Sequence, residues 1–242
     1  MCTVTYIPSA ETIFLTSNRD ENSWRSSAFP PAVAGMSSGK VIFPKDGDHS
    51  GTWIAGHENG NAVVFLNGAF QSHTPEPPYR KSRGLILLDL VDHPTPYNGF
   101  LAINLNRIEP FTAVIRDNDR LFECRWDGRR KSNAEIDPET MHIWSSVTLY
   151  DEMAAQARAD WFGKWQSEHK TITQQEILNF HRFAGSGDQT NDLLMNRNNQ
   201  VFTVSISSLA INAVSLKFLY LDVQNNQQYQ KELARQKSLT TR

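Results

Sequence analysis

The order of strand-like and helix-like segments constrains the fold of this chain more than any other feature. Runs rich in β-branched and aromatic residues come in pairs joined by turn residues, which is typical of antiparallel hairpins. We expect such pairs at 3–7 with 12–16, at 52–55 with 62–66, and at 112–116 with 120–124. Helical patterns follow, and further strand patterns come at 201–207 and 215–221. Hairpins and helices in separate blocks predict an α+β protein in which helices cover antiparallel sheets.

Three segments have the periodicity or the capping residues of helices. Apolar residues recur at helical spacing over 82–91 and over 151–170. Thr173-Gln174-Gln175-Glu176 is a capping box that opens a third helix through Phe180. We expect loops at 23–48 and 184–200. Beyond residue 222 the chain turns polar, which predicts a terminal helix or a frayed tail.

The composition excludes several classes of protein. The chain has 24 Lys and Arg against 26 Asp and Glu, a formal net charge of −2, so it lacks the basic surplus of a nucleic-acid binder. No stretch approaches the roughly 18 apolar residues of a membrane span. With 39% hydrophobic residues the chain can fill a sizeable core. We expect a single domain over residues 1–242, with a polar C-terminal tail from about 223.

The cysteines and histidines bear on location and cofactors. Cys2 and Cys124 cannot staple a chain of 242 residues, and the N-terminus lacks a basic segment followed by an apolar run. We therefore expect a reduced, cytoplasmic setting. The seven histidines form neither an HExxH motif nor a close pair with cysteine, so we expect no metal site and no cofactor. Cys124, on a predicted strand, is expected to be inert packing.

Cys2 is the residue that points most directly to chemistry. Initiator methionine is normally removed before a small residue, which would leave Cys2 with both a thiol and a free α-amine. Their pKa values in model peptides are about 8.5 and about 7.7–8.0. A nucleophile and a base then reside in one residue, as covalent acyl transfer requires. The alternative is a small apolar residue that begins a buried strand.

The first hairpin places a charged cluster beside this cysteine. A turn centred on residues 9–10 would put Cys2 opposite Ser17, and because side chains alternate along strands, Cys2 and Arg19 would share a face. Arg19 would then lower the pKa of the thiol and hold a substrate carboxylate or carbonyl. Asp20 or Glu21 would orient the amine. The alternative is a solvated strand end.

Met1-Cys2-Thr3 followed by Ser17-Asn18-Arg19-Asp20-Glu21 resembles the start of the NRDE family, also called the transport and Golgi organisation protein two family. More blocks follow in the family's order: Gly51-Thr52-Trp53-Ile54, Leu66-Asn67, Ser82-Arg83-Gly84 and Tyr97-Asn98-Gly99-Phe100. Weaker similarity continues through 144–146 and 201–207. The resemblance implies an N-terminal-nucleophile hydrolase-like fold, a four-layer αββα sandwich, and a distant similarity to choloylglycine hydrolases and penicillin V acylases.

The resemblance also implies roles for individual residues. Cys2 matches the nucleophile and Arg19 the site arginine. Those acylases have an aspartate three residues past the arginine, where this chain has Asn22, so Asp20 is the nearer acid and its role stays open. Asn67 resembles an oxyanion-hole asparagine, which would stabilise charge in the transition state. The alternative for Asn67 is a turn residue before glycine.

Further residues are candidates for contact with substrate: Asn18, Glu21, Trp53, Trp144, Ser145 and Ser146. The two tryptophans would line an apolar acyl pocket, or else belong to the core. Ser145 and Ser146 stand where other family members have a Ser-Asn pair, so a second amide donor would be missing. The charges at 80–83 are expected to be surface charges at a helix start rather than anion ligands.

These features together predict a cysteine amidohydrolase that cleaves a non-peptide C–N amide bond in a small molecule. The alternative is a non-catalytic carrier or trafficking factor on the same scaffold, with a hydrophobic ligand such as a lipid or haem. No Cys-Pro haem motif is present. Neither nucleic acid nor a membrane span is expected, and the sequence does not specify the oligomeric state.

Overall fold

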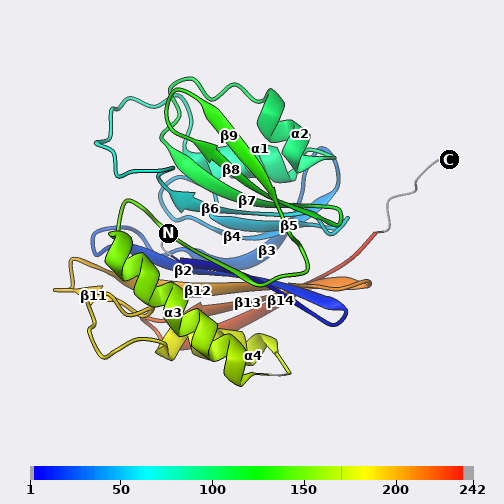
Figure 1. Cartoon of the computed structure of the whole chain (residues 1–242). Helices are drawn as coiled ribbons and strands as arrows, with labels where there is room; N and C mark the ends of the chain where they lie inside the picture. The colour runs from blue at the N-terminus through cyan, green and yellow to red at the C-terminus, as the bar shows by residue number, and fades with distance from the viewer. Residues whose placement is uncertain (1–2, 170, 237–242) are drawn as a thin grey trace.

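Two antiparallel sheets lie face to face, and helices cover the outer face of each (Figure 1). The computed structural model describes residues 3–169 and 171–236. Within these residues the layers run helix, sheet, sheet, helix, which is the αββα sandwich that the sequence predicts. The predicted α+β class is confirmed.

Sheet A contains both ends of the described chain. Its strands, in spatial order, are β10 (His142–Ser145), β1 (Thr3–Ser9), β2 (Thr12–Asn22), β12 (Val201–Ile211), β13 (Ser215–Asp222) and β14 (Gln227–Ala234), with β11 (Asn196–Arg197) paired to β12. β2 therefore lies between its sequence neighbour β1 and the distant β12. This pairing joins the beginning of the chain to its last part.

Sheet B follows chain order from one edge to the other. Its strands are β3 (Phe29–Gly35), β4 (Lys40–Lys45), β5 (Ile54–His57), β6 (Ala62–Asn67), β7 (Phe111–Asp117), β8 (Arg120–Trp126) and β9 (Lys131–Ile136). Short turns join most neighbours, as antiparallel pairing allows. The hairpin of β5 and β6 turns at an Asn-Gly pair, where Gly60 has a φ of +96°.

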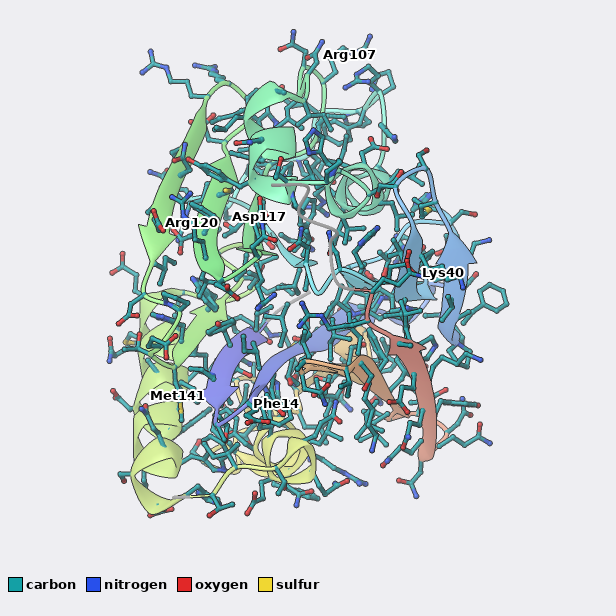
Figure 2. All side chains as sticks on the ribbon, turned by 90° about the vertical axis from the view of Figure 1, so that its right-hand side faces the viewer. Phe14, Lys40, Arg107, Asp117, Arg120 and Met141 are labelled. Carbon is teal, nitrogen blue, oxygen red and sulfur yellow. The ribbon has the colours of Figure 1, made fainter. Side chains whose placement is uncertain are left out.

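Each sheet has its own pair of helices. α1 (Arg83–Val91) and α2 (Pro96–Ala102) pack on sheet B, and α3 (Glu152–Glu168) and α4 (Gln174–Phe183) pack on sheet A. The predicted capping box is present, because the Thr173 hydroxyl and the Glu176 carboxylate each accept from the other's backbone N–H. Figure 2 shows Phe14 between sheet A and this helical layer, where it packs with Phe162 and Phe180. Within the described residues, none of the helices combines the length and apolar character needed to cross a membrane.

Alternation along β1 divides its side chains between two environments. Val4 and Tyr6 are buried between the sheets, together with Leu15 of β2. Thr3 and Thr5 face the helical layer, where their hydroxyls bond to Arg158 and His181. Both faces of this hairpin are therefore buried, and the face toward the helices combines polar groups with the apolar side chains of Ile7 and Phe14.

The register of the first hairpin differs from the predicted one. Ser9 pairs with Thr12, which leaves a two-residue turn in which Ala10 has a φ of +49°. Val4 therefore lies opposite Ser17, two residues along from the predicted partner of Ser17. Because the displacement is an even number of residues, the predicted sharing of faces is unchanged.

The structure contains several strands and one helix that the sequence does not predict. β3 and β4 lie in the segment expected to be a loop, and β9, β10 and α2 were not anticipated. The expected terminal helix or frayed tail is wrong, because β14 pairs with β13 along its whole length. Most side chains of β14 are exposed and polar, and Leu233 is its buried apolar residue. Backbone pairing, which a hydrophobic pattern does not report, holds this strand in place.

Candidate active site

A cavity of about 430 Å³ lies where the ends of β2 and β6 meet the start of α1. Its wall includes four residues that the sequence singles out: Arg19, Glu21, Trp53 and Asn67. They come from two sheets and from segments almost 50 residues apart in the chain. The cavity therefore brings the charged end of β2 together with Trp53 and Asn67, which only the family resemblance connects to it in sequence.

Arg19 forms one wall of this cavity and is 3% exposed. Its Nη2 lies 2.7 Å from Oδ2 of Asp46 and 3.3 Å from Oε2 of Glu21. The guanidinium also lies over the ring of Trp53, 4.9 Å from the ring centroid, in a cation–π contact. These contacts fix the position of a buried positive charge at the cavity.

Asp46 links two arginines at this wall. One of its oxygens lies 2.7 Å from Arg19 and 2.8 Å from Nη2 of Arg25. Backbone N–H groups of Asp48 and His49 each donate to its other oxygen at 3.0 Å. Burial acts to raise the pKa of Asp46, but the two guanidiniums and the backbone donors outweigh it and hold the pKa below its usual range. No signal in the sequence identifies Asp46 or Arg25, since both follow from the path of the segment between β2 and β5.

Asn18 points away from the cavity, into the helical layer. Its Nδ2 donates to the carbonyl oxygens of His181 at 3.1 Å and of Leu193 at 2.6 Å. Its Oδ1 faces Nδ1 of His181, whose Nε2 lies 2.8 Å from the Thr5 hydroxyl. Because Oδ1 can only accept, Nδ1 carries the proton and Nε2 accepts from Thr5. Burial, and then the charge of Arg158, lowers the pKa of His181 to about 3, so this imidazole is neutral.

Asp20 lies on the same face as Asn18. Its carboxylate accepts from the hydroxyl of Tyr150 at 2.7 Å and from that of Thr203 at 2.5 Å. Asp20 is 3% exposed and is absent from the cavity wall. The structure therefore brings Glu21, rather than Asp20, next to Arg19.

Asn67 ends β6 and contributes to the cavity wall. Its backbone carbonyl accepts from the Ser146 hydroxyl at 2.9 Å, and Gly68 follows with a φ of +78°. A Cβ at Gly68 would lie 2.6 Å from a methyl group of Val147, so this turn packs closely on the chain after β10. Among the described residues, none forms a hydrogen bond with the Asn67 carboxamide, which leaves it available to a ligand.

Three further candidates, Trp144, Ser145 and Ser146, are not among the residues that line the cavity. Trp144 is half-buried, and its indole Nε1 donates to Glu123 at 2.8 Å. Ser145 pairs with Thr3 in the sheet. Ser146 is buried and supports the backbone of Asn67. Trp53, by contrast, lines the cavity and is 3% exposed.

The start of α1 corrects one expectation, because the charges of Lys81 and Arg83 were expected at the surface. Lys81, Ser82 and Arg83 all line the cavity. Arg83 lies 3.2 Å from Glu109 and donates to the carbonyl of Pro110, and its burial lowers the pKa of the guanidinium. The family resemblance of the Ser82-Arg83-Gly84 block is the one sequence signal for these residues, and it does not show that they lie beside β2.

Of the two cysteines, the structure describes Cys124 and not Cys2. Cys2 lies outside the described residues, so its predicted role as nucleophile stays a prediction. The described chain begins at Thr3, which pairs with Asn18 and Ser145. Cys124 is fully buried, and burial raises the pKa of its thiol to about 12. Within residues 3–169 and 171–236, no group of three His, Cys, Asp or Glu side chains is arranged to hold a metal ion.

Solved structures with the same fold are N-terminal-nucleophile hydrolases. Two variants of the conjugated bile acid hydrolase from Clostridium perfringens superpose with a TM-score of 0.61 at 11% identity; the first comparison covers 98% of this chain and 97% of the hydrolase, the second 97% of each. The Caenorhabditis elegans orthologue of N-acylethanolamine-hydrolyzing acid amidase gives a TM-score of 0.57 at 9% identity, over 86% of this chain and 92% of the amidase. At these identities the likeness concerns the fold alone.

Sequence comparison gives the family. No curated protein matches the chain. The sequence profile of the Transport and Golgi organisation 2 family matches residues 1–236, which include the whole described sandwich and every residue of the cavity wall. The chain therefore belongs to the Transport and Golgi organisation 2 family.

Proposed function

We propose that this protein is a cysteine amidohydrolase that cleaves a non-peptide C–N amide bond in a small molecule, with Cys2 as its N-terminal nucleophile. The observation that carries the proposal is the cavity lined by both a buried guanidinium and a carboxamide that bonds to no residue in the described part of the chain. Thr3, the first described residue, pairs with Asn18, the neighbour of Arg19, and this pairing supports a nucleophile on the residue before Thr3. One structural relative is named as an amidase, which supports an amide as the bond class.

The chemistry follows from the two functional groups of a processed Cys2. The thiol gives its proton to the α-amine, and the sulfur attacks the amide carbonyl to form an S–C bond. The carboxamide of Asn67 donates to the oxyanion that develops. The protonated amine then gives its proton to the leaving nitrogen as the C–N bond breaks, which leaves an acyl-thioester on Cys2.

Water completes the cycle. The neutral amine takes a proton from the attacking water, the oxygen forms a bond to the acyl carbon, and the S–C bond breaks. The proton returns to sulfur, so that a carboxylic acid leaves and the thiol and the amine are restored. A cytoplasmic location would keep this thiol reduced between turnovers.

Arg19 and its acidic neighbours set the electrostatics of this step. The guanidinium favours the thiolate, while Glu21 and Asp46 fix its position. In this proposal Asn18 and Asp20 are positioning residues, because their side chains anchor β2 to the helical layer.

Alkylation of the native protein tests the nucleophile. Iodoacetamide is expected to label Cys2 and to spare Cys124, whose buried thiol has a pKa of about 12. Peptide mass mapping after short exposures gives the site, and Cys2→Ala is the control. In Arg19→Gln the midpoint of the pH profile of Cys2 alkylation should move upward. Labelling of Cys124 alone, or an N-terminus that retains Met1, would overturn the proposal.

A non-catalytic carrier on the same scaffold is the competing function. A lipid or haem carrier needs an apolar cavity, whereas this wall carries charged side chains from β2, from α1 and from the loops after β2, after β4, before α1 and before β7. Purification distinguishes the two: a carrier would co-purify with a hydrophobic ligand and would show no acyl adduct on Cys2.

A further inference from the structure

One wall of the cavity holds buried polar groups without partners. Trp53 is 3% exposed, and its indole Nε1 has no acceptor among the described residues. The Ser82 hydroxyl, also on this wall, is buried and equally without a partner in the described part of the chain. An indole N–H can only donate, and a hydroxyl can donate as well. Because unpaired buried donors are costly, these groups indicate a ligand that brings acceptor oxygens.

The same wall contains the N-terminus of α1. Ser82 is the N-cap of this helix but makes no side-chain capping bond, and the first turn has no acidic residue. The N–H groups of Leu85 and Ile86 donate to the Ser82 carbonyl. The backbone N–H groups of Arg83 and Gly84 are then the donors at the helix end. The helix dipole places partial positive charge here. Within α1, neither the Ser82 side chain nor an acidic side chain of the first turn accepts a hydrogen bond from these N–H groups.

Close packing joins the helix end to the segment just before β5 that carries Trp53. The Thr52 N–H donates to the carbonyl of Gly84 at 3.3 Å, and a Cβ on Gly84 would lie 2.8 Å from backbone atoms of Thr52. Only glycine permits this approach. It brings the donors of α1 and the donors of the Thr52–Trp53 segment to one side of the cavity.

The charges of the wall favour a single negative charge. Four cationic side chains line the cavity, Arg19, Arg25, Lys81 and Arg83, against three carboxylates, Glu21, Asp46 and Glu109. Lys81 also contacts the exposed Asp89 outside the wall. Arg25 likewise contacts Asp48 outside the wall. No net positive charge is therefore left to balance a dianion such as a phosphate monoester, and a monoanion held by directed N–H and O–H donors fits better.

We propose that the substrate amide bears a carboxylate, and that the N-terminus of α1, the Ser82 hydroxyl and the Trp53 indole N–H bind this carboxylate. The inference rests on the proposed amidohydrolase function and names its substrate class. A carboxylate offers two acceptor oxygens, which can take several of these donors at once. The reacting carbonyl then lies within reach of Arg19 and Asn67, which line the same cavity.

A matched pair of ligands tests the carboxylate site. Hexanoylglycine and hexanoylglycinamide share one acyl chain and one scissile amide, and they differ in the carboxylate. Calorimetric titration of full-length Cys2→Ala measures binding without turnover. We expect the acid to bind about tenfold tighter than the amide, as hydrogen bonds to a charged group imply.

Single substitutions show which side chains cause the preference for the acid over the amide. In the Cys2→Ala background, Ser82→Ala and Trp53→Phe should each lower the acid-to-amide affinity ratio at least about threefold, since each removes one donor. Phenylalanine keeps the ring face under Arg19. Lys40→Gln is the matched control, because it removes a charge from an exposed position on β4 outside the cavity wall and should leave the ratio unchanged (Figure 2). Because a general loss of structure would weaken both ligands, the affinity for hexanoylglycinamide serves as the internal reference.

The outcomes separate this inference from the proposed function. Equal binding of acid and amide, or no binding of the acid up to about 10 mM, overturns the carboxylate site. A ratio that neither variant lowers overturns it as well. If wild type still hydrolyses either compound, the amidohydrolase proposal survives that failure. If the acid is preferred but Cys2 forms no acyl adduct, the site binds carboxylates and the proposed chemistry is wrong.

Discussion

Asn18 and Arg19 are adjacent in β2, yet their side chains reach opposite layers of the molecule. The Asn18 carboxamide donates to the carbonyls of His181 and Leu193 in the helical layer, and the Arg19 guanidinium lies 2.7 Å from Asp46 at the cavity. One short motif therefore does two things. Alternate residues anchor the strand on one face and present charge on the other.

Replacing Asn18 should affect stability. Asn18→Leu removes the carboxamide that bonds to two buried carbonyls and to an imidazole N–H, and of these groups the Leu193 carbonyl keeps only a 3.4 Å contact from the Thr203 hydroxyl. We expect a loss of about 2–5 kcal/mol in the free energy of unfolding, measured by urea denaturation. A loss below about 1 kcal/mol would mean that water or neighbouring groups take over these bonds.

Replacing Asn67 should affect catalysis instead. Its carboxamide bonds to none of the described residues, so Asn67→Ala should change the free energy of unfolding by less than about 1 kcal/mol. If the carboxamide holds the oxyanion, kcat should fall about 10²–10³-fold with little change in KM. Steady-state kinetics on an accepted amide checks this. A change in KM alone would assign Asn67 to ground-state binding.

His181 should make stability depend on pH in the mildly acidic range. Burial, and then Arg158, lowers its pKa from 6.5 to about 3 in the folded protein. Between these values the unfolded chain binds a proton that the folded protein does not. The stabilisation is therefore fully present above pH 6.5 and is lost progressively as the pH falls toward 3. From about pH 7 to about pH 5 the loss should be about 2 kcal/mol.

His181→Gln supplies the comparison for this pH dependence. Glutamine retains a donor and an acceptor but does not titrate. Urea denaturation of both proteins between about pH 7 and pH 5 should give a shallower slope for the variant, because carboxylates titrate mostly below this range. Equal slopes would show that His181 binds a proton in the folded state as readily as in the unfolded one.

Two glycines in helices should respond to alanine in opposite ways. A Cβ on Gly84 would lie 2.8 Å from backbone atoms of Thr52, so Gly84→Ala must displace the start of α1. We expect a loss of about 1–3 kcal/mol in the free energy of unfolding. Gly163 in α3 has no atom within 4 Å of the same position. Gly163→Ala should therefore stabilise the protein by about 0.5–1 kcal/mol through helix propensity. Thermal denaturation of both variants checks the pair, and a neutral Gly84→Ala would mean that the helix start can move freely.

The sequence predicts the layers of the fold but not all of their parts. Strands with β-branched residues and a helix with a capping box, such as α4, carry their own local signals. β3 contains two prolines and β14 is mostly polar, so neither shows the pattern of a strand. These strands form because a neighbouring strand offers backbone partners, which is a property of the assembled sheet.

The candidate site, too, is predictable from the sequence only in part. Alternation along β2 is enough to place Arg19 and Glu21 on one face and Asn18 and Asp20 on the other. It does not report that Asp46 would pair with Arg19, or that the start of α1 would complete the cavity. Those contacts depend on how the chain passes from β2 in sheet A to the strands of sheet B, and on the path of the loop between β6 and α1.

The pairing of β2 with β12 has a consequence for biosynthesis. Residues 201–211 leave the ribosome long after residues 12–22, so one edge of β2 has no strand partner during most of translation. N-terminal processing acts on the nascent chain, and the nucleophile would thus be exposed before its surrounding walls exist. A polypeptide that stops before Val201 should retain the complete motif of β2, fail to form the cavity, and aggregate through the unpaired edge.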